Sequence, residues 1–168
     1  MILRMSFLNQ LKMLSDLIFI SICYFLLLYI SLETFDFKLI SCLVIPYVLI
    51  SIFPVLFLHF NYLNQGKSII FEINQNKILK KMGNNILKYH IEEINEIVFF
   101  MNGAKNTGYG ALPFKKYHYA KINFLDGSCF IITSLYSSKI DKILEENFKD
   151  VKMTTEKVFY PMIRSVEN

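Results

Sequence analysis

The side chains that could catalyse a reaction or bind a metal in this chain are its three histidines and two acidic pairs. His59, His90 and His118 fall in different predicted elements and lack the close spacing of a metal site. The pairs Glu92-Glu93 and Glu145-Glu146 are sequence neighbours, so their side chains point apart in either a helix or a strand. No Ser, Cys or Thr lies in a nucleophile motif. We therefore predict that the protein is not an enzyme, with no catalytic residue, no metal site and no cofactor.

Cysteines and glycines give no stronger signal. Cys23 and Cys42 lie inside apolar segments and Cys129 lies in a strand-like run, so we interpret all three as small buried hydrophobic residues. Residues 102–116 form a long predicted loop that contains three glycines. Their spacing matches neither the P-loop nor the dinucleotide fingerprint, and no strand-to-helix context surrounds them. We expect no nucleotide binding there.

Basic charge is the remaining chemical signal. Residues 61–168 hold 15 Lys plus Arg against 11 Asp plus Glu, a net charge of +4. Near an anionic leaflet, each basic residue gains about 1 kcal/mol, so one hypothesis is that a set of lysines holds this region against lipid headgroups. A plain solvated surface is the other interpretation, and the excess is too small to indicate nucleic-acid binding. The candidate membrane-surface residues are Lys77, Lys80, Lys81, Lys88, Lys105, Lys115 and Lys116.

Two apolar segments near the start of the chain predict where the rest of the protein lies relative to a membrane. Leu39 to Phe60 is 22 residues long without a charged side chain, and as a helix it would extend roughly 33 Å, enough to cross a hydrocarbon core. Leu17 to Leu32 has 16 uncharged residues and reaches about 24 Å. We predict a transmembrane hairpin within residues 17–63, preceded by a segment 1–16. That segment fits either an interfacial amphipathic helix or a simple cytoplasmic lead-in.

Flanking charge predicts the orientation of the hairpin. Arg4 and Lys12 precede the first span, Lys38 stands in the connection at residues 33–38, and Lys67 is the first of several lysines after the second span. The positive-inside rule then predicts a multi-pass protein of the inner (plasma) membrane with both termini in the cytoplasm. Pro46 and Pro54 predict kinks in the second helix. His59 is expected at the interface, and residues 61–66 are expected to be a brief linker.

Residues 64–168 are expected to form one cytoplasmic domain, mostly of strands. Asp126-Gly127 favours a two-residue type I′ turn, which would place Phe124 opposite Cys129 and Ile122 opposite Ile131. An amphipathic helix is predicted over residues 138–149, with Ser138 and Asp141 as a capping box, and residues 151–163 could add a last strand. The other predicted strands are residues 68–73, 77–82, 85–91, 96–101, 117–125 and 128–134.

The strands in meander order, the bend at residues 91–94, the hairpin at Asp126-Gly127 and the closing helix resemble the bacterial PH-like domains that follow transmembrane hairpins. The resemblance covers about residues 67–150 and implies a PH-like antiparallel β-barrel or sandwich, closed by one C-terminal helix. Six strands are recognisable where a full PH barrel has seven, and the tail or the 102–116 loop would supply the missing one. The predicted fold class is thus a membrane α-hairpin plus an α+β domain.

Such a domain implies a membrane-anchored, non-catalytic interaction or scaffold module. Its ligands would be anionic lipid headgroups or a membrane-protein partner. The alternative function is an accessory or immunity-type membrane protein that acts through helix contacts within the bilayer. The sequence predicts no nucleic-acid partner and indicates no oligomeric state.

Overall fold

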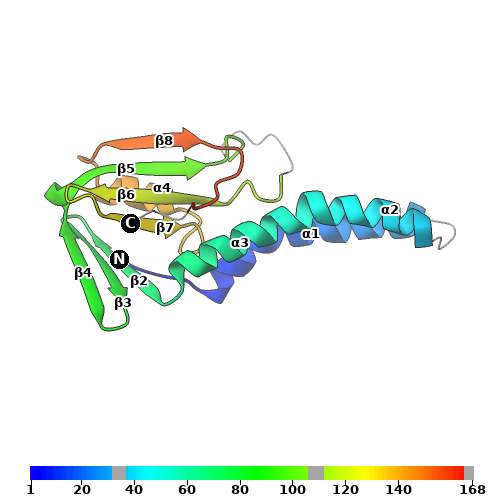
Figure 1. The fold of residues 1–168 in the computed structure, drawn as a ribbon, viewed down its shortest axis with the longest axis horizontal. Helices are drawn as coiled ribbons and strands as arrows, with labels where there is room; N and C mark the ends of the chain where they lie inside the picture. The colour runs from blue at the N-terminus through cyan, green and yellow to red at the C-terminus, as the bar shows by residue number, and fades with distance from the viewer. Residues whose placement is uncertain (32–36, 106–111, 165–168) are drawn as a thin grey trace.

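The fold is described by a computed structural model for residues 1–31, 37–105 and 112–164. A long helical hairpin projects from a domain that contains two β-sheets (Figure 1). Two predicted features lie outside the described residues: positions 33–36 of the polar connection and positions 106–111 of the long loop.

The hairpin has two arms, and its second arm changes helix type along its length. A π-helical turn lies between Pro46 and Pro54, where the sequence predicts kinks. Pro54 has no N–H to donate to the carbonyl of Ile50, so the hydrogen-bond ladder must shift there. The arms are α1 (Phe7–Ser31), followed by α2 (Phe37–Tyr47), η1 (Val48–Ile52) and α3 (Phe53–Gly66).

By length and composition, both arms could cross a membrane. A signal sequence or a buried core helix passes the same test, so the finding alone gives weak support for a membrane span. The apolar windows are only 11% and 6% buried within the protein. The arms contact each other through polar groups as well: Ser21 Oγ lies 2.8 Å from Tyr47 Oη, and Tyr24 donates to the Leu43 carbonyl at 2.9 Å.

The second arm continues as a helix into the domain. Residues 61–66, predicted as a linker, are the last turns of α3. His59, predicted at the interface, is buried, and its Nδ1 lies 2.9 Å from the hydroxyl of Tyr117. The buried Tyr62 donates its hydroxyl to the Pro161 carbonyl at 2.7 Å. These contacts hold the base of the hairpin against the domain.

The first sheet contains a strand that the sequence did not predict. Ile2–Arg4 forms β1, which pairs antiparallel with β2 so that Leu3 lies opposite Phe71. For segment 1–16 the sequence left an interfacial helix and a simple lead-in open and predicted no strand; α1 begins at Phe7. Leu3 is buried, so this short strand is held by one core side chain and by main-chain pairing. The helical hairpin is thus inserted between two neighbouring strands of one sheet.

The remaining strands of the first sheet agree with the predicted ranges. The sheet has the order β1-β2-β3-β4 with antiparallel neighbours. Its edge strand β4 is exposed along most of its length. Its elements after the hairpin are β2 (Ile69–Asn74), β3 (Lys77–Met82) and β4 (Asn85–His90), followed by the 3-10 turn η2 (Ile91–Glu93).

The second sheet has the order β7-β6-β5-β8. Its fourth strand comes from the tail, as the sequence allowed, and β8 runs parallel to β5 with Phe99 opposite Thr155. The tail and β1 therefore supply two strands beyond the six predicted. The elements are β5 (Ile94–Met101), β6 (His118–Phe124), β7 (Cys129–Thr133), α4 (Ile140–Asn147) and β8 (Met153–Lys157).

The turn between β6 and β7 differs from the predicted type I′ turn. Ile122 pairs with Phe130 rather than with Ile131, because the Phe124 amide donates to the Ser128 carbonyl across a three-residue loop. Gly127 has φ +86°, the left-handed conformation that ends such a loop. A shift of one residue reverses every side chain of a strand. Phe130 therefore joins the core, whereas Cys129 and Ile131 are only partly buried.

The core lies between the two sheets and α4. Buried side chains of α4 and of the residue after it, Ile140, Leu144 and Phe148, pack against buried residues of β5 and β6. The predicted capping box does not form, since Lys139 is the N-cap residue and makes no side-chain cap. Asp141 instead accepts a hydrogen bond from Lys105. The amphipathic pattern thus predicted the position of the helix correctly. The side-chain contacts of its first turn depend on Lys105, which is distant in sequence.

Candidate functional site

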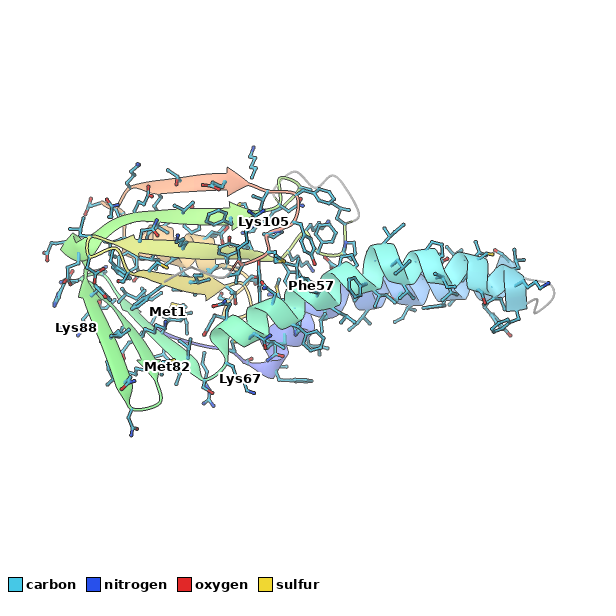
Figure 2. The ribbon with its side chains drawn as sticks, viewed as in Figure 1. Met1, Phe57, Lys67, Met82, Lys88 and Lys105 are labelled. Carbon is cyan, nitrogen blue, oxygen red and sulfur yellow. The ribbon has the colours of Figure 1, made fainter. Side chains whose placement is uncertain are left out.

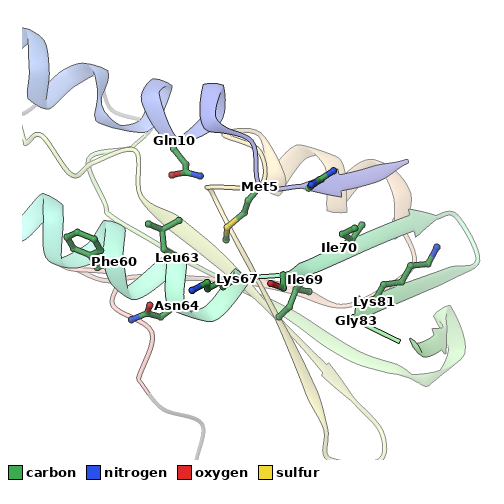
Figure 3. Close-up of a pocket in the computed structure, with 13 residues that line it drawn as sticks. Met5, Gln10, Phe60, Leu63, Asn64, Lys67, Ile69, Ile70, Lys81 and Gly83 are labelled. Carbon is green, nitrogen blue, oxygen red and sulfur yellow. The ribbon is translucent and has the colours of Figure 1, made fainter. Parts of the chain in front are cut away.

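A cavity of about 760 Å³ lies where the helical hairpin joins the domain. Its walls come from the β1–α1 connection, the last turns of α3, and the adjoining parts of β2 and β3 (Figure 3). Because the chain leaves the first sheet after β1 and returns to it at β2, both crossing points border this cavity. The fold therefore brings Met5 and Lys67 into one wall although they are far apart in sequence.

The cavity is positively charged. Arg4 at the end of β1, Lys67 after α3 and Lys81 on β3 line it, and its described lining contains no Asp or Glu. Lys81 Nζ lies 2.9 Å from Glu72 Oε2 in a partly exposed ion pair. The hydrogen bond from Lys81, together with its charge, lowers the pKa of Glu72. Lys81 is therefore partly neutralised, and Arg4 and Lys67 carry most of the uncompensated charge.

The backbone around the cavity is held in defined turns. Ser68 has φ +66° and Gly83 has φ +58°, and Ser68 is the one non-glycine residue with positive φ in the described chain. That conformation costs an ordinary residue about 1–2 kcal/mol. The buried hydroxyl of Tyr136 lies 3.1 Å from the Gly66 carbonyl and 3.2 Å from the Ile69 carbonyl, so it fixes the turn from both sides. Lys67 is thus presented by a rigid turn.

The predicted membrane-surface lysines do not gather on one surface. Lys77, Lys80 and Lys81 lie on β3 and Lys88 lies on β4, and Lys81 is the member of this group that lines the cavity. Figure 2 shows Lys88 at the end of the domain away from the helical hairpin. Lys80 Nζ lies 5.2 Å from the ring centroid of Phe130, a cation–π contact with a core ring.

The three lysines between β5 and β6 are nearer to the hairpin, and two are paired within the protein. Lys105 Nζ lies 2.7 Å from Asp141 Oδ2, and Lys116 Nζ lies 2.6 Å from Asp16 Oδ1 on α1. Lys115 is partly buried. The charge of an ion-paired lysine is partly neutralised, so it attracts an anionic ligand less strongly. Lys105 and Lys116 therefore contribute mainly to contacts within the protein.

The histidines of the sequence analysis lie apart. His118 is buried at the start of β6, with Nδ1 2.8 Å from the Lys116 carbonyl and Nε2 3.8 Å from Asp141 Oδ1. His90 lies at the end of β4, where its backbone amide donates to Glu93 Oε2 at 2.6 Å. Across the described ranges, no group of three or more His, Cys, Asp or Glu side chains could hold a metal ion.

Sequence reasoning selected Lys81 but not the other two basic residues of the cavity. In the sequence, Arg4 and Lys67 indicate only the orientation of the hairpin, because they flank the apolar segments. Their proximity depends on the pairing of β1 with β2, which connects residues on opposite sides of the hairpin. A basic residue immediately before and after the inserted hairpin was the one local signal available.

Comparison with known proteins identifies a family for this chain. A protein-family model described as PH domain matches residues 3–140. The match begins in β1, includes the helical hairpin and the strands β2 to β7, and ends at the first residue of α4. No curated protein matches the chain. The hairpin and the strands on each side of it therefore fall within one family unit.

Proposed function

This chain belongs to the PH-domain family, and from that premise we propose that it is a membrane-anchored, non-catalytic binding module. Its ligand is the anionic headgroup of a phospholipid, held in the basic cavity. One observation carries the proposal: Arg4, Lys67 and Lys81 line a single cavity beside the points where the apolar hairpin enters the domain.

Exposed apolar surface supports the membrane anchor. Phe19 is 69% exposed on α1 and Ile50 is 71% exposed on η1, and many of their neighbours are similar. Contiguous apolar surface of this extent marks a membrane or protein interface. Arg4, Lys12 and Lys67 flank the domain end of the hairpin, which favours a cytoplasmic domain at the plasma membrane with both chain ends on the same side.

The apolar surface of the hairpin continues to the mouth of the cavity. Phe7 and Leu8 at the start of α1 are 76% and 75% exposed, and Phe60, which lines the cavity, is 60% exposed. A bilayer that covers these side chains brings its headgroups to Arg4 and Lys67. Each basic residue then contributes about 1 kcal/mol of attraction to an anionic lipid.

Titration with short-chain lipids tests this proposal. We expect the protein in uncharged detergent to bind short-chain phosphatidylglycerol more tightly than short-chain phosphatidylcholine, as measured by isothermal calorimetry. The triple variant Arg4→Gln, Lys67→Gln, Lys81→Gln removes three charges. At about 1 kcal/mol each, its Kd for phosphatidylglycerol should rise roughly 100-fold.

A second triple variant provides the matched control. Lys77→Gln, Lys80→Gln and Lys88→Gln change the net charge equally but lie outside the cavity lining. Phosphatidylglycerol binding should be almost unchanged in this protein. Equal losses in the two variants would indicate a diffuse charge effect, and the absence of any preference for phosphatidylglycerol in the unmodified protein would refute the proposal.

A further inference from the structure

A second cavity, an apolar groove of about 480 Å³, lies between the second arm of the hairpin and the domain. Phe53 and Phe57 form its helical wall, while Phe114 and Phe159 belong to its domain wall. Tyr160 closes one side and donates its hydroxyl to the Pro54 carbonyl. The described lining contains no charged side chain, so the groove suits an apolar occupant.

Phe114 is buried, but three other rings of the groove are incompletely covered by the protein itself. Phe159 is 74% exposed, Phe53 is 61% exposed and Phe57 is 48% exposed. Exposed apolar area costs about 25 cal/mol per Å² relative to burial, so several aromatic rings left in water are unfavourable. Figure 2 places Phe57 where the hairpin meets the domain.

The length of the hairpin decides what covers the groove. A hydrocarbon core of about 30 Å takes roughly 20 helical residues. Counted from Phe37 at the start of α2, that length ends near Phe57. Counted back from Ser31 on α1, it ends near Leu11, which is 46% exposed. In both arms the hydrocarbon must therefore extend to the base of the hairpin, which is the level of the groove.

Two of the charges at this level, those of Asp16 and Lys116, compensate each other. Asp16 on α1 pairs with Lys116 at 2.6 Å, and Lys116 follows the groove residue Phe114 by two positions. An unpaired carboxylate near hydrocarbon is costly, whereas a closed ion pair can lie at the boundary between hydrocarbon and headgroups. Lys12, four residues before Asp16 on α1, is exposed, and its long side chain can reach the headgroups. The base of the hairpin can thus sit in that boundary.

We propose that the groove lies in the hydrocarbon layer and is filled by an acyl chain of a phospholipid from the leaflet that faces the domain. This inference rests on the proposed membrane anchoring. It goes further because it embeds a part of the chain outside the hairpin, namely the exposed ring of Phe159, in the bilayer. A lipid is then held at its headgroup side by the domain surface and at its chain by the groove.

Tryptophan quenching by brominated lipids tests this placement. The chain contains no Trp, so Phe159→Trp is a unique reporter in reconstituted vesicles of phosphatidylcholine. Its emission should be lost with bromine on the acyl chain, and more strongly with bromine near the headgroup end than near the methyl end. Phe57→Trp on the opposite wall should give the same pattern, which covers the case that one variant does not fold.

Two control reporters separate failure of this inference from failure of the membrane anchor. Phe25→Trp lies on α1, six residues before Ser31, which is about 9 Å of helix. It is therefore about 6 Å from the middle of the hydrocarbon core and should be quenched more by bromine near the methyl end. Leu125→Trp, on the exposed turn between β6 and β7, should keep its emission with either lipid.

The outcomes are distinct. Quenching of Phe25→Trp without quenching of Phe159→Trp and Phe57→Trp would place the groove outside the bilayer or under another protein surface, and it would overturn this inference alone. Loss of quenching at Phe25→Trp as well would overturn the membrane anchor itself. Quenching at all three positions with Leu125→Trp unaffected is the result that the inference predicts.

Discussion

Protonation of His118 should destabilise the protein as the pH falls. The side chain is 1% exposed, and the hydrogen bond between Nδ1 and the Lys116 carbonyl measures 2.8 Å. Burial lowers the pKa of His118 from 6.5 to about 4, and the charge of Lys105 acts in the same direction. The Asp141 carboxylate favours the charged imidazole, but it already binds Lys105 at 2.7 Å, so burial dominates.

The magnitude follows from proton linkage. A histidine that is neutral in the folded state binds a proton in the unfolded state once the pH is below 6.5. The contribution of His118 is therefore fully present above that pH and is lost progressively as the pH falls toward its folded pKa. Between pH 7 and pH 5 the loss amounts to about 2 kcal/mol.

Thermal unfolding of the detergent-solubilised protein measures this effect. We compare the unmodified protein with His118→Asn, whose amide can still donate toward the Lys116 carbonyl but does not titrate. For a chain of this size, about 2 kcal/mol corresponds to a Tm difference of roughly 4–8 °C. The Tm of the unmodified protein should fall by that much more than the Tm of the variant between pH 7 and pH 5. Parallel pH profiles would refute the assignment of a low pKa to His118.

Three further substitutions, with Gly103→Ala as a control, test the packing around the cavity and the β6–β7 turn. Gly66→Ala places a Cβ 1.9 Å from Met5 Cε and 2.9 Å from the Tyr136 hydroxyl, so it should destabilise the protein by about 1–3 kcal/mol in denaturant unfolding. Tyr136→Phe removes the hydroxyl that lies 3.1 Å from the Gly66 carbonyl and should cost about 1 kcal/mol; an unchanged unfolding midpoint would contradict that hydrogen bond. Gly127→Ala forces a side chain onto φ +86° and should cost about 1 kcal/mol, whereas Gly103→Ala, which meets nothing within 4 Å, should be nearly neutral.

The helical hairpin was predictable because its signal is local. A run of 22 uncharged residues at Leu39–Phe60 predicts a long helix from composition alone. The additional turns to Gly66 were missed, since Asn61, Asn64 and Gln65 are polar and the helix there is held by tertiary contacts. Tyr62 is buried against the domain within that segment, and no local pattern indicates such a neighbour.

The strand β1 and the basic cavity were beyond sequence reasoning for a related reason. Three residues, Ile2–Arg4, carry too little alternation to predict a strand, and their partner β2 lies beyond the whole hairpin. Arg4 and Lys67 become neighbours of one cavity only through that pairing. Lys81 was selected because the lysines of the β3–β4 hairpin are close in sequence.

The turn at Asp126-Gly127 shows how a correct element can carry a wrong register. The sequence located both strands, but the length of the loop between them is decided by the left-handed conformation of Gly127 and by the bond from the Ser128 amide to Asp126 Oδ1 at 2.9 Å. A two-residue and a three-residue loop are both compatible with Asp-Gly. Phe130 therefore lies in the core, where the sequence predicted Cys129 and Ile131.

The central claim is that the basic cavity selects an anionic phospholipid at the membrane surface. Native mass spectrometry tests it by counting the lipids that remain bound after gentle extraction from vesicles of phosphatidylglycerol and phosphatidylcholine in equal amounts. The unmodified protein should retain phosphatidylglycerol preferentially, and the variant Arg4→Gln, Lys67→Gln, Lys81→Gln should retain both lipids equally. Preferential retention of phosphatidylglycerol by that variant would contradict the claim.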